Sequence, residues 1–83
     1  MFTGIIETVG EVEQIKKEGD NIIFTIKSKI SSELKIDQSL SHDGVCLTVV
    51  EKTESTHSVV AIKETSIKSN VKEWKVGTLI NLE

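Results

Sequence analysis

Short segments with alternating apolar residues recur along this chain, and they constrain its fold more than any other feature. The segments are separated by roughly ten to twenty residues, with Gly, Asn, Asp or Ser at the turns between them. A two-residue period places alternate side chains on opposite faces of a strand, so one face can be buried. The pattern predicts a small antiparallel sandwich or barrel, with strands at residues 9–12, 22–26, 44–50, 58–62 and 78–82.

Two short helical stretches are expected between these strands. Residues 31–35 begin with serines, whose hydroxyls can cap free N–H groups, and residues 65–71 carry apolar side chains four positions apart. The first strand is expected to extend over residues 5–14 and to bend. Gly10 lies within it and marks either a bulge or the close approach of another backbone.

Length and composition exclude several classes of protein. A chain of 83 residues supports one core, so residues 1–83 are expected to form a single domain. The net charge is −3 and the lysines are scattered, which argues against nucleic acid as a partner. No apolar run reaches the length of a membrane span and no signal peptide is evident, so a cytoplasmic protein is expected. Cys46 is the one cysteine, and together with His42 and His57 it supplies too few ligands for structural zinc.

Polar side chains that could meet a ligand gather around the strand at residues 44–50. Cys46 and Thr48 share one face of this strand, opposite Val45, Leu47 and Val49. They could contact a ligand, or Thr48 could pack across strands and Cys46 could act as a small apolar side chain. Ser39, Ser41 and His42 precede the strand. They are read as turn residues, or as groups that bind a polyhydroxylated ligand, with His42 also able to move protons near neutral pH.

Further candidates lie at the first strand and at the end of the fourth. Peptide groups at residues 60–65 become free of sheet pairing where the strand passes into a helix, and either Thr65 caps this end or a ligand edge pairs with it. Gly4, Ile5 and Ile6 form either the entry of the first strand or an apolar wall beside a ring, and Phe2 could pack nearby. Trp74 is expected in the core, and His57 is expected at a solvated hairpin tip.

Several short motifs in a fixed order resemble a known family. They are Met-Phe-Thr-Gly-Ile-Ile-Glu at residues 1–7, Gly-Val-Cys-Leu-Thr-Val at 44–49, Lys-Glu-Thr at 63–65, Trp-Lys-Val-Gly at 74–77 and Asn-Leu-Glu at 81–83. Together they resemble the N-terminal lumazine-binding barrel of the riboflavin synthase alpha chain, over essentially the whole sequence. The resemblance implies an all-β fold, a small six-stranded antiparallel Greek-key barrel with one or two short helices.

The resemblance also implies a ligand and a site. Riboflavin synthase converts two molecules of 6,7-dimethyl-8-ribityllumazine to riboflavin and 5-amino-6-ribitylaminouracil, with no metal or redox cofactor, and its main task is to hold two lumazines face to face. Ser39 and Cys46 are candidate catalytic residues, neither of them assigned. The ligand-binding residues implied by the match are Gly4, Ile5, Ile6, Cys46, Leu47, Thr48, Val60, Ala61, Ile62, Lys63, Glu64 and Thr65.

Three functional hypotheses follow from a single barrel of a two-barrel family. The first is a lumazine- or flavin-binding domain that is inactive or weakly active alone, either as part of a synthase or as a separate binding module. The second is an enzyme assembled from identical barrels, as a homodimer or, within a longer chain, a trimer. The third is a structural barrel that has lost its ligand, in which replacement of Thr48 by Val would be silent.

Overall fold

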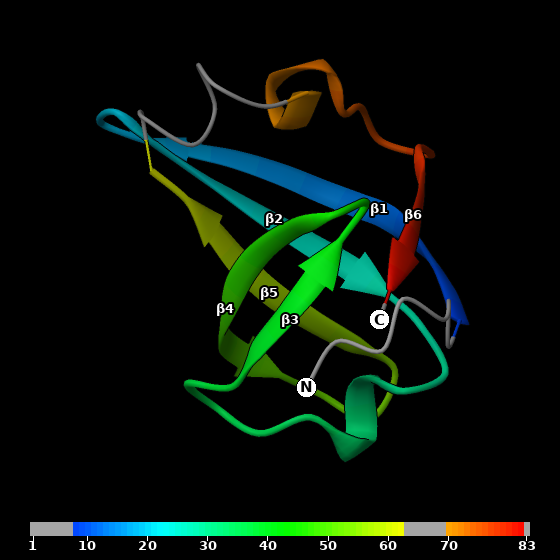
Figure 1. The fold of residues 1–83 in the computed structure, drawn as a ribbon. Helices are drawn as coiled ribbons and strands as arrows, with labels where there is room; N and C mark the ends of the chain where they lie inside the picture. The colour runs from blue at the N-terminus through cyan, green and yellow to red at the C-terminus, as the bar shows by residue number, and fades with distance from the viewer. Residues whose placement is uncertain (1–7, 63–69, 83) are drawn as a thin grey trace.

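Six antiparallel strands close into a barrel in the computed structural model, which describes residues 8–62 and 70–82 (Figure 1). The order around the barrel is β1-β2-β5-β4-β3-β6, so β5 rather than β3 lies next to β2. This arrangement confirms the expected barrel. The strands are β1 (Thr8–Glu18), β2 (Asn21–Lys27), β3 (Ser39–His42), β4 (Val45–Lys52), β5 (Thr56–Ala61) and β6 (Leu79–Leu82), with 3-10 turns η1 (Ser31–Glu33) and η2 (Asn70–Glu73).

The barrel closes through a narrow seam between β3 and β6. Their ladder contains the single pair His42↔Leu82, whereas β3 pairs with β4 from Ser39↔Thr48 to His42↔Val45. Just beyond the seam, the Asp43 N–H donates to the Asn81 carbonyl and the Asn81 N–H donates to Asp43 Oδ1, both at 2.8 Å. β3 therefore depends mainly on β4 and on contacts inside the barrel for its position.

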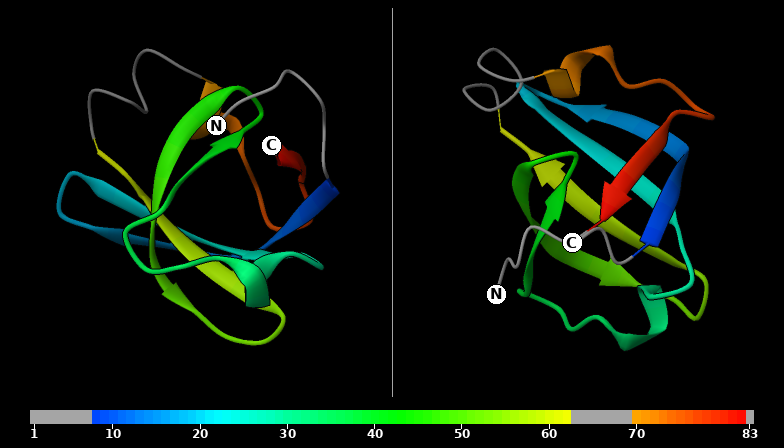
Figure 2. Two further views of the ribbon diagram at one scale, coloured as in Figure 1. Left: turned by 60° about the horizontal axis from the view of Figure 1, so that its bottom comes forward. Right: turned by 45° about the vertical axis from the view of Figure 1, so that its right-hand side comes forward.

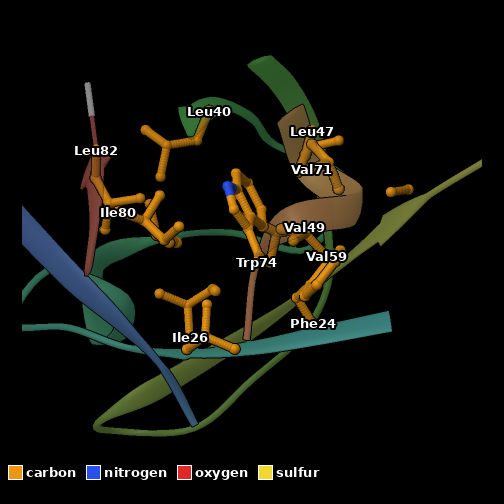
Figure 3. Close-up of a cluster of buried hydrophobic side chains, with 13 residues drawn as sticks. Phe24, Ile26, Leu40, Leu47, Val49, Val59, Val71, Trp74, Ile80 and Leu82 are labelled. Atoms are coloured by element: carbon orange, nitrogen blue, oxygen red, sulfur yellow. The ribbon is translucent and has the colours of Figure 1, made fainter. Parts of the chain in front are cut away.

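The apolar core receives side chains from all six strands and from the segments at η1 and η2. Trp74 follows η2 and points into the middle of the cluster (Figure 3). Its ring meets Phe24 edge-on, with centroids 5.0 Å apart and planes at 67°. The buried apolar residues of the described chain are Val12, Phe24, Ile26, Leu34, Leu40, Leu47, Val49, Val59, Ala61, Val71, Trp74, Ile80 and Leu82. Trp74 is thus a core residue, as its position in the sequence predicts.

The first helical segment is shorter than the sequence pattern predicts. η1 has three residues rather than the five expected at 31–35, and its N-cap residue Ile30 makes no side-chain cap. The Ser31 hydroxyl does not cap the turn, because it bonds to Ser28 and His57 instead. Most of the second predicted helix, residues 65–69, lies outside the described residues. η1 and η2 lie over opposite ends of the barrel (Figure 2).

Gly10 resolves one ambiguity of the sequence. The register of β1 against β2 shifts between Val12 and Gln14, so the irregularity lies beyond Gly10. A Cβ atom at Gly10 would lie 2.6 Å from Ile26 Cγ2 and 3.0 Å from Leu82 Cδ1. Gly10 is therefore required for a close approach to these core side chains.

Replacing Gly10 with Ala is expected to lower the free energy of unfolding by about 1–3 kcal/mol, because the added methyl group overpacks a filled core. Urea denaturation measures the loss. Val9→Ala is the matched control, since Val9 is the neighbouring residue of β1 and is 49% exposed. Equal midpoints for the two variants would contradict the assignment of Gly10 to a packing constraint.

Candidate functional site

The outer face of the β3–β4 hairpin carries a cluster of small polar side chains. Ser39 lies opposite Thr48 and Ser41 lies opposite Cys46, so the strand register brings these four residues together. Ser39, Cys46 and Thr48 are exposed, Ser41 is buried, and Cys46 is a free thiol. This arrangement offers hydroxyl donors and acceptors from two strands to a molecule lying against the barrel wall.

Two of the expected ligand-binding residues face the opposite way. Leu47 is 4% exposed and Ala61 is fully buried, and both belong to the core cluster. Their inward direction follows from the alternation that turns Cys46 and Thr48 outward. Only the backbone groups of Leu47 and Ala61 remain as possible contacts for a ligand on the outer wall.

The end of β5 lies beside this wall. β4 and β5 are neighbours in the barrel, and their described ladder runs from Lys52↔His57 to Val49↔Val59. On its other edge, β5 stays paired with β2 as far as Ala61. Val60 is half-buried and Ile62 is 51% exposed, so both can contribute an apolar border to the polar cluster.

The rest of the expected site lies outside the described residues. This applies to Phe2, Gly4, Ile5 and Ile6 near the start of the chain, and to Lys63, Glu64 and Thr65 after β5. We use the term outer wall for the described part, namely Ser39, Ser41, Cys46, Thr48, Val60 and Ile62.

Two open pockets elsewhere on the barrel contain none of these residues. One, of about 430 Å³, lies between β1, the segment after β2 and the β4–β5 turn, and the other, of about 290 Å³, lies beside it. The larger pocket is lined by Val9, Glu11, Lys27, Ser28, Lys29, Glu54 and Ser55. Both pockets mix acidic and basic side chains, and no residue of the outer wall lines either of them.

A chain of buried polar groups crosses the barrel interior near η1. His42 and His57 are both fully buried, and their Nε2 atoms are 2.9 Å apart. His42 Nδ1 lies 2.9 Å from the Leu40 carbonyl oxygen, and His57 Nδ1 lies 2.8 Å from Ser31 Oγ. Ser31 Oγ is in turn 2.8 Å from Ser28 Oγ. These hydrogen bonds link β3, β5 and the segment that leads into η1.

The prediction of a solvated His57 is therefore wrong, and His42 is a strand residue instead of a turn residue. His57 shares the parity of Val59 and Ala61 in β5, which turns its ring toward the core. That parity was the signal available in the sequence. Nothing in the sequence signals that His42 is the partner of His57, because only the barrel topology brings the two residues together.

The directions of these hydrogen bonds follow from one fixed acceptor. The Leu40 carbonyl can only accept, so neutral His42 carries its proton on Nδ1 and offers Nε2 as an acceptor. His57 must then donate from Nε2 and accept at Nδ1 from the Ser31 hydroxyl. Ser31 accepts in turn from the Ser28 hydroxyl. Every bond is satisfied when both imidazoles are neutral.

Burial keeps both imidazoles neutral at physiological pH. Desolvation lowers the pKa of His42 from 6.5 to about 4, although its bond to Leu40 and the charge of Asp43 act in the opposite direction. Desolvation likewise lowers the pKa of His57 to about 4, and the neighbouring His42 adds to the effect. These values do not favour the alternative in which His42 moves protons near neutral pH.

Two further observations bear on ligands and location. Among residues 8–62 and 70–82, no three His, Cys, Asp or Glu side chains are grouped so that they could hold a metal ion. Within the same described ranges, no helix has the length and apolar character needed to cross a membrane.

Comparison with known proteins relates the whole chain to one group. A family model described as "Lumazine binding domain" matches residues 3–83. Riboflavin synthase of Bacillus subtilis is 38% identical over 84 residues, and that of Saccharomyces cerevisiae is 35% identical over 91 residues. Each alignment covers 100% of this chain but only 39% and 38%, respectively, of the relative. The chain thus spans about two fifths of the length of these synthases.

Solved structures agree with the sequence comparison. Crystal structures of LumP complexed with 6,7-dimethyl-8-(1'-D-ribityl) lumazine and with riboflavin each give a TM-score of 0.88 at 26% identity. The similarity covers 100% of this chain, and 48% and 46% of the two LumP chains. A third similar structure is LumP complexed with flavin mononucleotide.

Proposed function

Because this chain belongs to the lumazine-binding domain family, we propose that it binds 6,7-dimethyl-8-ribityllumazine or riboflavin against the outer wall of its barrel. The main support for this proposal is the family match over residues 3–83, and the geometry of β3 and β4 is consistent with the proposal. Thr48 and Cys46 face outward on a strand whose other side is sealed by core residues. The wall therefore offers polar groups to a ligand without opening the core.

The proposed contacts divide by chemistry. The Thr48 hydroxyl can donate to a ring nitrogen or accept from a ring N–H, and the hydroxyl of Ser39 opposite it suits a ribityl chain. Val60 and Ile62 would pack on the ring, with backbone groups of Leu47 and Ala61 behind them. The remaining proposed contacts are Gly4, Ile5, Ile6, Lys63, Glu64 and Thr65, from segments outside the described residues.

We further propose that the chain supplies one of the two lumazine sites of a riboflavin synthase, with residues 1–83 as a single ligand-binding barrel. Synthesis of riboflavin needs two lumazines held together, so one barrel alone is expected to be inactive or weak. Two copies could supply two sites as a homodimer. Ser39 and Cys46 remain candidate catalytic residues, no metal or redox cofactor is required, and a cytoplasmic location is expected.

The test is to add purified protein to 6,7-dimethyl-8-ribityllumazine and to follow the absorbance spectrum for hours, with sedimentation to give the oligomeric state. An immediate saturable shift without a growing flavin band would identify a binding barrel. Protein-dependent formation of riboflavin would identify a working synthase assembled from identical barrels. A spectrum equal to that of the free ligand would reject the proposal, and with it both ligand-binding hypotheses.

Thr48→Val is expected to weaken lumazine binding about fivefold, since it removes one hydrogen bond worth about 1 kcal/mol and keeps the shape of the side chain. Fluorescence titration gives the dissociation constant. Thr25→Val is the matched control, because it makes the same exchange on β2, where Thr25 Oγ1 lies 3.2 Å from Ser58 Oγ. Equal affinities of Thr48→Val and the parent chain would contradict the proposed contact between Thr48 and the ligand.

A further inference from the structure

The buried histidine pair connects strands that are not neighbours in the sheet. β4 lies between β3 and β5 in the barrel order, yet His42 Nε2 and His57 Nε2 meet at 2.9 Å across the interior. Because β3 joins β6 through a single pair, this contact adds a direct polar tie between β3 and β5 across the interior. Ser31 extends the tie to η1 at the same end.

This tie depends on the number of protons that the pair holds. One added proton can be held on His57 Nδ1, provided that the Ser31 hydroxyl turns to accept from it and to donate to Ser28, while a single proton still lies between the two Nε2 atoms. The resulting charge would still be buried without a paired anion. A second proton would place two N–H donors face to face at 2.9 Å, which cannot be satisfied. The pair therefore titrates as a unit.

Few other charges face the pair in the described residues. Asp43 is adjacent to His42 and attracts a proton there, while its Oδ1 accepts the Asn81 N–H. Lys52 of β4 is in register with His57, but its Nζ lies 3.2 Å from the Ser32 carbonyl at the surface. The other residues in register with the pair are apolar, namely Ile26 of β2, Val45 of β4 and Leu82 of β6. No described carboxylate is thus positioned to compensate a doubly protonated pair.

We propose that the neutral His42–His57 pair is a latch that holds β3 against β5 and η1, and that its protonation releases β3 and thereby weakens ligand binding on the outer wall. The second half of this proposal rests on the proposed function. Ser39 and Ser41 belong to the same short strand as His42, so a shift of β3 moves them relative to Cys46 and Thr48. His42 and His57 are positioning residues that touch no ligand.

Amide hydrogen exchange tests the latch without any ligand. At pH 7.5 the amides of β3 are expected to be less protected than those in the β1–β2 ladder, because β3 opens separately. After correction for intrinsic rates, β3 protection should fall at least roughly 30-fold by pH 5, the factor expected if even one imidazole returns to its ordinary pKa on opening. Equal protection of β3 and the β1–β2 ladder, or β3 protection that does not change with pH, would overturn the latch.

The matched variant is His57→Gln, which does not titrate and retains one donor and one acceptor. Its β3 protection is expected to fall by a smaller factor over the same pH range, since only His42 remains to gain a proton on opening. A direct measurement on the parent chain covers the case in which this variant fails to fold. Nitrogen-15 spectra at pH 7.5 should show His42 protonated on Nδ1 and His57 on Nε2, and any other pair of tautomers would overturn the proposed chain.

Binding tests the link to the outer wall. The dissociation constant of 6,7-dimethyl-8-ribityllumazine is expected to rise more than about tenfold in the parent chain between pH 7.5 and 4.5, and by a smaller factor in His57→Gln, which retains only His42. Comparison of the two proteins at the same pH removes the titration of the ligand, which both share. Binding that is present at pH 7.5 but equally strong at pH 4.5 would overturn the link, whereas no binding at pH 7.5 would reject the proposed function and leave hydrogen exchange to decide the latch.

Discussion

Phe24→Ala is expected to lower the free energy of unfolding by about 3–5 kcal/mol, the largest effect of any single substitution considered for this chain. Phe24 is 1% exposed and lies on β2, between Ile15 of β1 and Val59 of β5 in the sheet. Its ring also meets Trp74 edge-on at 5.0 Å. Truncation would leave a cavity between β2, its neighbours β1 and β5, and the ring of Trp74. Small domains have total stabilities of roughly 5–15 kcal/mol, so this loss is a large fraction.

The measurement is urea denaturation followed both by circular dichroism and by the fluorescence of Trp74, the single tryptophan of the chain. Val76→Ala is the control, since Val76 is 66% exposed and its truncation should change the free energy of unfolding by less than about 0.5 kcal/mol. A change below about 1 kcal/mol in Phe24→Ala would mean that the Phe24–Trp74 contact does not organise the core.

The sequence predicts the strands that have a regular apolar face, and misses the one that does not. Alternation marks β2, β4, β5 and β6 to within a few residues, because the inward positions of β2, β4 and β6 carry Val, Ile, Leu or Phe, and those of β5 include Val59 and Ala61. Alternation of apolar residues does not reveal β3, because Ser39–His42 contains one apolar residue although three of its four residues are buried. The six-stranded closure came from the family resemblance.

The wrong predictions for Ser31 and His57 have a common physical cause. The start of η1 has the local pattern of an N-cap, but Ser31 forms its bond with His57, which lies 26 positions away in the sequence. Local propensity cannot anticipate a partner that only the closed barrel supplies. The outer wall was easier to predict, because the alternation that buries Leu47 and Val49 turns Cys46 and Thr48 outward. The actual ligand contacts stay a prediction until binding is measured.

Acid is expected to destabilise the folded chain through the same two histidines. Each imidazole has its pKa lowered from 6.5 to about 4 by burial, so between these pH values the unfolded chain binds more protons than the folded chain. The stabilisation is fully present above about pH 6.5 and is lost as the pH falls toward 4. One such shift corresponds to on the order of 3 kcal/mol, and the coupling within the pair prevents simple doubling.

Urea denaturation at pH 7, 5.5 and 4 measures this loss, and the difference between the parent chain and His57→Gln removes the contribution of the surface carboxylates, which both proteins share. The parent should lose more free energy of unfolding on acidification than the variant, with most of the difference appearing below pH 6.5. Parallel pH profiles would show that His57 is not held neutral by burial in the folded chain. Such a result would contradict the directed hydrogen-bond chain from Leu40 to Ser28, since that chain is complete only while both rings lack a second proton.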